Sequence, residues 1–132
     1  QEHIGKLTLA IHECDKPVIA AINGVTLGGG CALALACDIR VASDQARIGA
    51  GVLKTGLSNC DVGISYLLPR IVGAGIAAEL MLTNRFVEAD EALRTGLVSR
   101  ITSADALDTA ALEIARAIRE GPEFGVWMVK KT

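Results

Sequence analysis

Long apolar runs, metal-ligand spacings and an excess of basic residues are all missing from this sequence. No apolar run approaches the roughly 20 residues that a membrane-spanning helix needs, and the N-terminal segment is too charged for a secretory signal peptide. The net charge is −2 at pH 7, so nothing suggests a nucleic-acid-binding surface. We therefore expect a cytoplasmic protein, or one from a similarly reducing compartment, with neither a membrane nor a nucleic acid as partner.

The four cysteines and two histidines do not follow the pattern of a metal site. No Cys-x-x-Cys spacing occurs, and Cys31 and Cys37 lie among Ala and Leu residues, where a free cysteine behaves as a small hydrophobe. His3 and His12 belong to the opening polar segment, where a solvated or packed histidine is the default interpretation. We expect no metal site and assign the histidines no chemistry.

What the chain does contain is a balance of residues typical of a globular domain. Its 132 residues are 51% hydrophobic and 21% charged, which is enough apolar material for a real core. No internal repeat, low-complexity tract or linker divides the sequence. We expect a single folded unit over residues 1–132.

The most informative stretch is KPVIAAINGVTLGGGCALALACDIRVAS, residues 16–43. Val18 to Ile22 reads as a short buried strand, and Asn23-Gly24 is a turn signal directly after it. A second short apolar run follows, then three glycines, then the helix formers of CALALA. This order predicts two strands, a glycine turn and a buried helix.

Three glycines at the start of a helix leave backbone N–H groups without a covering Cβ, at the positive end of the helix dipole. Such a helix end suits negative charge, although the same glycines could serve only a tight turn or close packing. A nucleotide-binding P-loop is excluded, because that pattern ends in Gly-Lys-Ser/Thr and Gly30 is followed by Cys31 and Ala32.

The same stretch resembles the signature segment of the crotonase, or enoyl-CoA hydratase/isomerase, superfamily. The resemblance continues through Gly56, Val72-Gly73, LMLTNR at 80–85 and Gly96-Leu97-Val98. It implies an α/β crotonase-like spiral of short strands with covering helices. Chains of the family are longer, so the sequence reads as a partial domain, truncated at the N-terminal side and shortened at the C-terminus.

The resemblance also implies a chemistry. In the family the backbone N–H of the middle glycine, here Gly29, is one of two donors to the thioester oxygen of an acyl-CoA. Removing one donor to a developing oxyanion typically costs about 2.7–4 kcal/mol. The implied partner is a coenzyme A thioester as substrate, with no further cofactor. Family members also assemble as trimers or hexamers, so the resemblance implies a homo-oligomer.

Both glutamates that activate water in hydratases of the family are absent here. The first follows the Gly-Gly-Gly-Cys motif, where this chain has Ala32, and the second ends a Phe-Gly-x-Pro-Glu segment, where it has Val52. In the family, the polar loop within residues 56–70 lines the acyl pocket. One carboxylate in this pocket loop, Asp61, falls close to where some family members place an acid/base aspartate. Asp61 could equally cap a helix starting at Val62, and the two roles are compatible. Isomerisation therefore suits these residues better than hydration, and a catalytically silent acyl-CoA-binding or structural relative is the alternative.

Outside these motifs the pattern predicts ordinary covering elements. Gly73-Ala74-Gly75-Ile76-Ala77-Ala78 fits a dinucleotide fingerprint, but no adequate strand precedes it and Glu88 is too near to leave room for a full crossover helix. We interpret it instead as a turn at Gly73 that enters a helix. We expect helices at 1–14, 62–69, 74–82, 88–95, 104–120 and 123–131, and further strands at 38–42 and 98–101.

Overall fold

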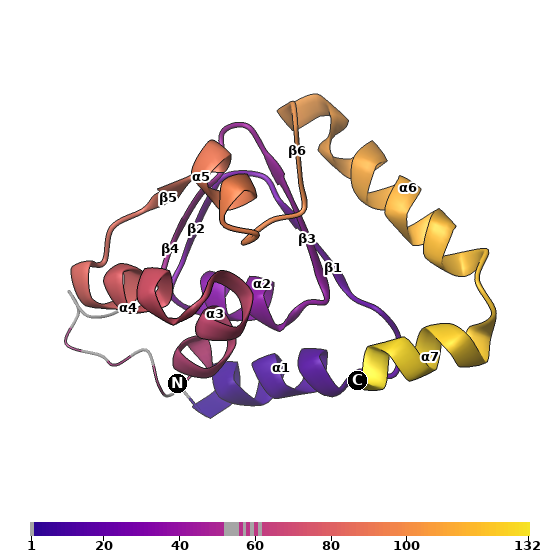
Figure 1. The fold of residues 1–132 in the computed structure, drawn as a ribbon, viewed down its shortest axis with the longest axis horizontal. Helices are drawn as coiled ribbons and strands as arrows, with labels where there is room; N and C mark the ends of the chain where they lie inside the picture. The colour runs from indigo at the N-terminus through magenta and orange to yellow at the C-terminus, as the bar shows by residue number, and fades with distance from the viewer. Residues whose placement is uncertain (1, 52–55, 57, 59, 61) are drawn as a thin grey trace.

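In the computed structural model, residues 2–51, 56, 58, 60 and 62–132 are described. They form two three-stranded sheets surrounded by helices (Figure 1). The elements in chain order are α1 (Glu2–Glu13), β1 (Ile19–Ile22), β2 (Val25–Leu27), α2 (Gly29–Ala36), β3 (Ile39–Ser43), β4 (Arg47–Gly49), α3 (Ile64–Val72), α4 (Ala74–Thr83), β5 (Val87–Glu88), α5 (Ala89–Arg94), β6 (Arg100–Thr102), η2 (Ala104–Ala106), α6 (Leu107–Arg119) and α7 (Glu123–Lys131).

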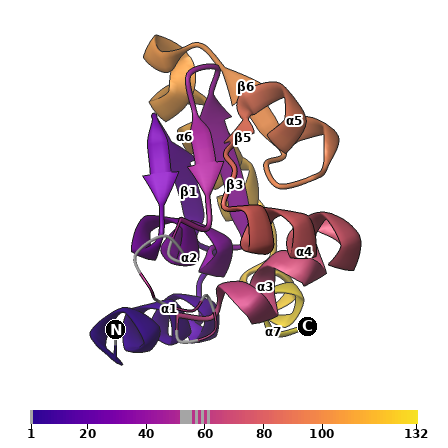
Figure 2. The ribbon, with the colours of Figure 1, turned by 90° about the vertical axis from the view of Figure 1, so that its left-hand side faces the viewer.

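The two sheets are built by a chain that repeats the same path. β1 and β2 form one coil, and β3 and β4 stack beside them in parallel, with Ile19 next to Ile39 and Val25 next to Arg47. β6 extends the first sheet in parallel on β3, while β5 closes the second in antiparallel on β4. In Figure 2 the paired strands of successive coils lie side by side. This is the predicted α/β spiral of short strands.

Helix α2 connects the two coils and is almost entirely buried. Its sequence, GGCALALA, is apolar on every side, and Cys31, Ala32, Leu35 and Ala36 are all at most 3% exposed. A helix that is apolar all round belongs inside a core. α1 and α3 pack on α2 (Figure 1), so the position of Gly29 is fixed by packing from several directions.

The predicted N-terminal helix is confirmed. Leu7 stands at helical spacing with Ile4 and Ile11, but it does not lie on the buried face of the helix. Ile4 and Ile11 pack on the core and Thr8 is buried, whereas Leu7 is 53% exposed. The Thr8 hydroxyl donates to the carbonyl of Ile4 at 2.9 Å, which satisfies its polar group inside the helix. The inward stripe therefore runs through Ile4, Thr8 and Ile11 and not through Leu7.

The helix expected at 62–69 was wrong at both ends. α3 begins at Ile64 after Gly63, whose φ of 87° makes it a left-handed N-cap without a side-chain hydrogen bond. An Asp61 cap on a helix starting at Val62 is therefore excluded. The helix then continues through Pro69 to Val72, because burial of Leu67, Leu68 and Val72 on its inner face outweighs the hydrogen bond that proline lacks.

The remaining differences are small. Ile71 and Val72 are helical, so no strand precedes Gly73 and the dinucleotide interpretation stays rejected; Gly73, with a φ of 87°, starts α4 as expected. β4 lies at the edge of a stretch where the sequence showed no clear period, and β5 lies in the strand-like segment RFVE, residues 85–88. On α7, Phe124 is 71% and Met128 47% exposed, so this side of the helix is not core.

Candidate functional site

The glycine turn before α2 is held open by the backbone of the neighbouring coil. Gly28 is buried with φ 55° and ψ −117°, a conformation that favours glycine. Its N–H donates to the carbonyl of Ala50 at 3.1 Å, just after β4. This bond uses the amide of Gly28, so the next amide at the start of the helix is that of Gly29.

The Gly29 N–H is suited to donate a hydrogen bond to a negatively charged oxygen. Gly29 is the first residue of α2, and none of the hydrogen bonds given for the described part of the chain uses its amide. Gly29 is half-buried and Gly30 exposed, and the first turn of α2 carries no acidic side chain. A free amide at the positive end of a helix can stabilise a negatively charged oxygen.

Close packing gives Gly29 a second reason to be glycine. A Cβ built on Gly29 would lie 3.0 Å from Cδ1 and 3.6 Å from Cγ2 of Ile4, on α1. α1 thus covers one side of the glycine and leaves its amide on another. The structural interpretation therefore applies to this residue, and its chemical role stays a prediction.

The hydratase glutamate positions are occupied or bordered by small residues. Ala32 is fully buried at 0% exposure. Gly51, next to the second position, has a φ of 70°, and a Cβ there would overlap the side chain of Leu27. A proline, which the family pattern has at this position, cannot adopt a positive φ. Val52 and Asp61, the second glutamate position and the candidate proton carrier, lie outside the described residues.

The other end of α2 is closed by Arg40, which the sequence pattern did not single out. Its guanidinium donates to the carbonyls of Ala34 and Cys37 at the helix C-terminus, and its Nε donates to Leu97 O at 2.9 Å. Burial lowers the pKa of Arg40, but arginine stays charged at neutral pH. A cation at this end complements the helix dipole and ties α2 to the loop before β6.

The two cysteines near α2 take no part in chemistry that needs a thiolate. Burial raises the pKa of the Cys31 thiol to about 12. Burial also raises the pKa of Cys37, whose Sγ lies 3.3 Å from the carbonyl of Leu33. Both behave as the small hydrophobic residues that the sequence predicted.

Asp38 has a structural role at the junction between α2 and β3. It accepts a hydrogen bond from the Val18 N–H at 2.7 Å, which fixes the entry to β1. It also pairs with Lys130, whose Nζ lies 2.9 Å from both carboxylate oxygens. Ninety-two residues separate the two partners, and no local pattern in the sequence indicates such a contact.

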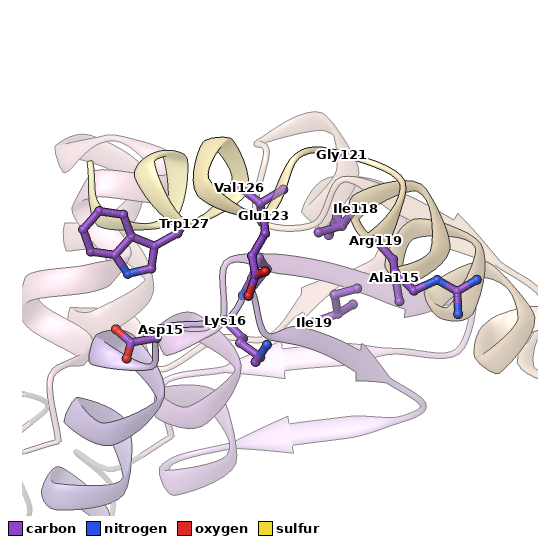
Figure 3. Close-up of a pocket in the computed structure, with 11 residues that line it drawn as sticks. Asp15, Lys16, Ile19, Ala115, Ile118, Arg119, Gly121, Glu123, Val126 and Trp127 are labelled. Atoms are coloured by element: carbon purple, nitrogen blue, oxygen red, sulfur yellow. The ribbon is translucent and has the colours of Figure 1, made fainter.

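Two hollows formed by described residues lie away from Gly29. One, of about 570 Å³, is lined by Pro17, Ile19, Ile118, Val126 and Trp127 among others, and the second, of about 630 Å³, adjoins it. Figure 3 shows the first between the α1–β1 connection, β1, α6 and α7. Gly29 lines neither, so we base the site on the free amide and its helix and not on these hollows.

Two further features are absent from the described residues. Within the described ranges, no three His, Cys, Asp or Glu side chains come together as they would around a metal ion. No helix in the same part of the chain has both the length and the apolar character needed to cross a membrane.

Comparison with known proteins agrees with the fold. The family model described as enoyl-CoA hydratase/isomerase matches residues 1–132. The chain belongs to the enoyl-CoA hydratase/isomerase family. A curated probable enoyl-CoA hydratase of Mycobacterium tuberculosis is 44% identical over 131 residues, which is 99% of this chain and 46% of the relative. The chain therefore spans about half the length of the curated relatives it matches.

Solved structures of the family give the same picture. A probable enoyl-CoA hydratase/isomerase from Mycobacterium abscessus is 43% identical with a TM-score of 0.93, covering 97% of this chain and 49% of that one. A protein described as a monofunctional enoyl-CoA isomerase from M. smegmatis is 43% identical with a TM-score of 0.89, covering 97% of this chain and 60% of that one. The fold is the crotonase fold, as the signature segment predicted.

Proposed function

We propose that this enoyl-CoA hydratase/isomerase family chain acts on enoyl-CoA thioesters by isomerase-type proton transfer and not by hydration. The observation that carries the proposal is the free amide of Gly29 at the positive end of a buried helix. A thioester oxygen placed there would gain charge as a proton leaves the acyl chain, and a preorganised donor stabilises that charge.

The residue types around the helix favour isomerisation. Hydration in this family uses two carboxylates that orient and deprotonate a water, and this chain has Ala32 and Val52 at those positions. Ala32 is completely buried, and its methyl side chain can neither orient nor deprotonate a water. Moving a double bond needs one group that takes and returns a proton. Asp61 is our candidate for that group, because its carboxylate lies in the predicted pocket loop.

The experiment that tests this proposal follows both reactions in one sample. Purified protein is incubated with a 3-enoyl-CoA and, separately, with a 2-enoyl-CoA, and the products are analysed by mass spectrometry and by absorbance of the conjugated thioester. We expect double-bond migration without a change in mass. A gain of one water in either sample would show hydration and overturn the proposal.

The role of Asp61 has its own test. Asp61→Asn should abolish double-bond migration and leave the calorimetric dissociation constant for a saturated acyl-CoA within about twofold. The conservative variant Asp61→Glu should retain part of the migration rate, because a carboxylate is kept. Migration at the wild-type rate in Asp61→Asn would remove this residue from the mechanism.

A second candidate function is a catalytically silent acyl-CoA-binding or structural relative. It is favoured by the packing of Ile4 on Gly29, which explains the glycine without chemistry, and by Ala32 and Val52 at the positions of the two hydratase glutamates. This alternative predicts binding of saturated and unsaturated acyl-CoA without turnover. In that case Asp61→Asn would change thermal stability at most.

We also propose a cytoplasmic location and a homo-oligomer, either a trimer or a hexamer. Large apolar side chains are exposed on several elements, among them Val25 at 66%, Leu82 at 76% and Val129 at 76%. Exposed apolar surface of this kind favours association. Sedimentation velocity at two concentrations tests the assembly, and a monomer at both would contradict it.

A further inference from the structure

The helix α7 stands apart from the rest of the fold in how it is held. No residue of α7 is buried as a whole, although the Lys130 side chain is enclosed. None belongs to the apolar core or to the partly buried side chains that pack against that core. Residues 120–122, where Gly121 is followed by Pro122, connect it to α6. Figure 1 shows α7 lying beside the end of α1, away from both sheets.

The side of α7 that faces α6 and Pro17 borders the two hollows. The two adjoining hollows described above share Pro17, Ile118, Gly121 and Val126 in their walls, and together they run along the underside of the α6–α7 corner. We refer to them as the trough. A well-packed helix would fill such a space with side chains, so apolar packing contributes little to holding α7 in place.

Charge holds the far end of α7 instead. The Nζ of Lys130 lies 2.9 Å from each carboxylate oxygen of Asp38 and 3.4 Å from the carbonyl of Ile11, and the Lys130 side chain is only 2% exposed. Lys131 donates to the carbonyl of Glu13 at 3.0 Å and pairs with Asp15 at 2.8 Å. We call these contacts the latch. They place two cations at the C-terminal end of α1, where the helix dipole is negative.

The two lysines differ in how firmly they hold. Lys131 and Asp15 are 36% and 77% exposed, so water and salt screen this pair and it contributes little. Lys131 nevertheless lowers the pKa of Asp15 through its hydrogen bond and its charge. Lys130 is almost fully enclosed, and an enclosed ammonium is stable only while its partners stay in place. Lys130 is therefore the residue on which the latch depends.

From these contacts we propose that α7 is a hinged strap over the trough, fastened by the latch and not by apolar packing. It lifts as a unit about Gly121 and Pro122 while the sheets, α2 and α1 stay folded. Local opening of this kind is expected where apolar contacts are few and the remaining bonds are polar. Lifting would uncover the apolar walls that Ile19 and Ile118 contribute to the trough.

The chain contains its own reporter for this motion. Trp127 is its one tryptophan, lies on α7 and faces Asp15 across the mouth of the trough (Figure 3). Acrylamide quenching of its fluorescence therefore measures the exposure of the strap alone, while far-ultraviolet circular dichroism measures the fold as a whole.

The test compares Lys130→Met with a matched control on the purified 132-residue chain. Lys130→Met removes the ammonium and keeps an aliphatic side chain of similar reach. Lys6→Met removes another lysine from an exposed pair with Glu2, on α1, and should change nothing. We expect Lys130→Met to raise the quenching constant of Trp127 to that of the urea-unfolded chain, with the dichroism spectrum of a folded protein retained.

Two results with Lys130→Met would contradict the proposal that α7 is a hinged strap. One is a quenching constant in Lys130→Met equal to that of the wild type. The other is a rise in quenching that occurs only together with loss of the whole dichroism signal, because α7 would then unfold with the core. Asp38→Asn weakens the latch from the other side and guards against an effect peculiar to one substitution. Hydrogen exchange of the wild type, read by mass spectrometry, must also show α7 amides exchanging faster than those of α2.

Discussion

Asn84 ends α4 in a left-handed conformation, with a φ of 58°, and it is the only described residue other than glycine with a positive φ. Its side chain is buried, and neither amide atom has a hydrogen-bond partner in the described structure. A buried polar group without a partner costs about 1–3 kcal/mol, and a positive φ is a position that glycine occupies without strain.

Asn84→Gly should therefore stabilise the protein by about 1 kcal/mol, measured as a rise of a few degrees in the thermal midpoint. Asn84→Ala is the matched control, because it removes the same amide but keeps a Cβ at the strained φ. We expect it to gain less than Asn84→Gly. A loss of stability in Asn84→Gly would mean that the amide of Asn84 is satisfied and useful.

Two glycines, Gly51 and Gly56, allow a matched test of the packing after β4. Gly51 and Gly56 both have a positive φ, 70° and 76°, but a Cβ on Gly51 would overlap Leu27, whereas one on Gly56 meets no atom of the described residues within 4 Å. Gly56→Ala should cost only the strain of the conformation, about 1–2 kcal/mol. Gly51→Ala should cost about 1–3 kcal/mol more, from overpacking against Leu27.

Urea unfolding of both variants measures the difference in the free energy of unfolding. The double variant Gly51→Ala/Leu27→Ala should then lose less than the sum of its single variants, because the overlap disappears with the Leu27 side chain. Equal costs for Gly51→Ala and Gly56→Ala would show that Leu27 does not press on this turn.

At the scale of elements, α4 and α5 are joined by an arginine between two glutamates. Arg85 donates two hydrogen bonds to Glu91, at 2.8 and 2.9 Å, and a third to Glu79 at 2.7 Å. The hydrogen bond from Arg85 lowers the pKa of Glu91 below its ordinary value of 4.5, and the pKa of Arg85 is raised by the same contacts. The Glu91 side chain is only 23% exposed, so screening by water is limited.

This interaction predicts an acid dependence with a definite sign. Because the folded-state pKa of Glu91 is lowered, its contribution to stability is fully present above pH 4.5 and is lost as the pH falls through the folded value. Glu91→Gln should destabilise the protein at pH 7, and the difference from the wild type should shrink at pH 3. Urea midpoints at the two pH values measure it. Glu2→Gln, from the exposed pair with Lys6, should match the wild type at both.

The elements that could be predicted from the sequence are those fixed by nearby residues. Ile19 to Leu27 and the glycine turn before α2 follow from short apolar runs separated by turn residues, and the family resemblance supplied how the coils stack. The end of α3 could not be predicted, because Pro69 normally stops a helix and only burial of Val72 in the assembled core carries it further. The exposure of Leu7 likewise depends on which side α2 covers.

For the site itself, prediction from the sequence reached Gly29 but not its supports. Arg40 stands only four residues after Ala36, where α2 ends, yet its contact with Leu97 spans 57 residues. The contact between Lys130 and Asp38 spans 92. Such contacts exist only after the coils have stacked, so neither hydrophobic periodicity nor turn signals indicate them.

At the scale of the whole molecule, the proposed function depends on one backbone group, the amide of Gly29. Side-chain substitutions do not normally remove an amide, but proline does, and the first residue of a helix is the position that accepts proline best. The only described obstacle to a side chain at Gly29 is Ile4, whose Cδ1 lies 3.0 Å from the built Cβ. Ile4→Ala removes that obstacle and provides a common background for two variants.

The deciding measurement is the calorimetric affinity for an acyl-CoA, together with the rate of double-bond migration, in Ile4→Ala/Gly29→Ala and Ile4→Ala/Gly29→Pro. Both place a side chain at residue 29, and only the second lacks the N–H. We expect the alanine variant to keep activity and the proline variant to lose about 10²–10³-fold in rate, the usual effect of one oxyanion donor, with both folded by circular dichroism. Equal rates in the two folded variants would contradict the assignment of the Gly29 amide as the oxyanion donor.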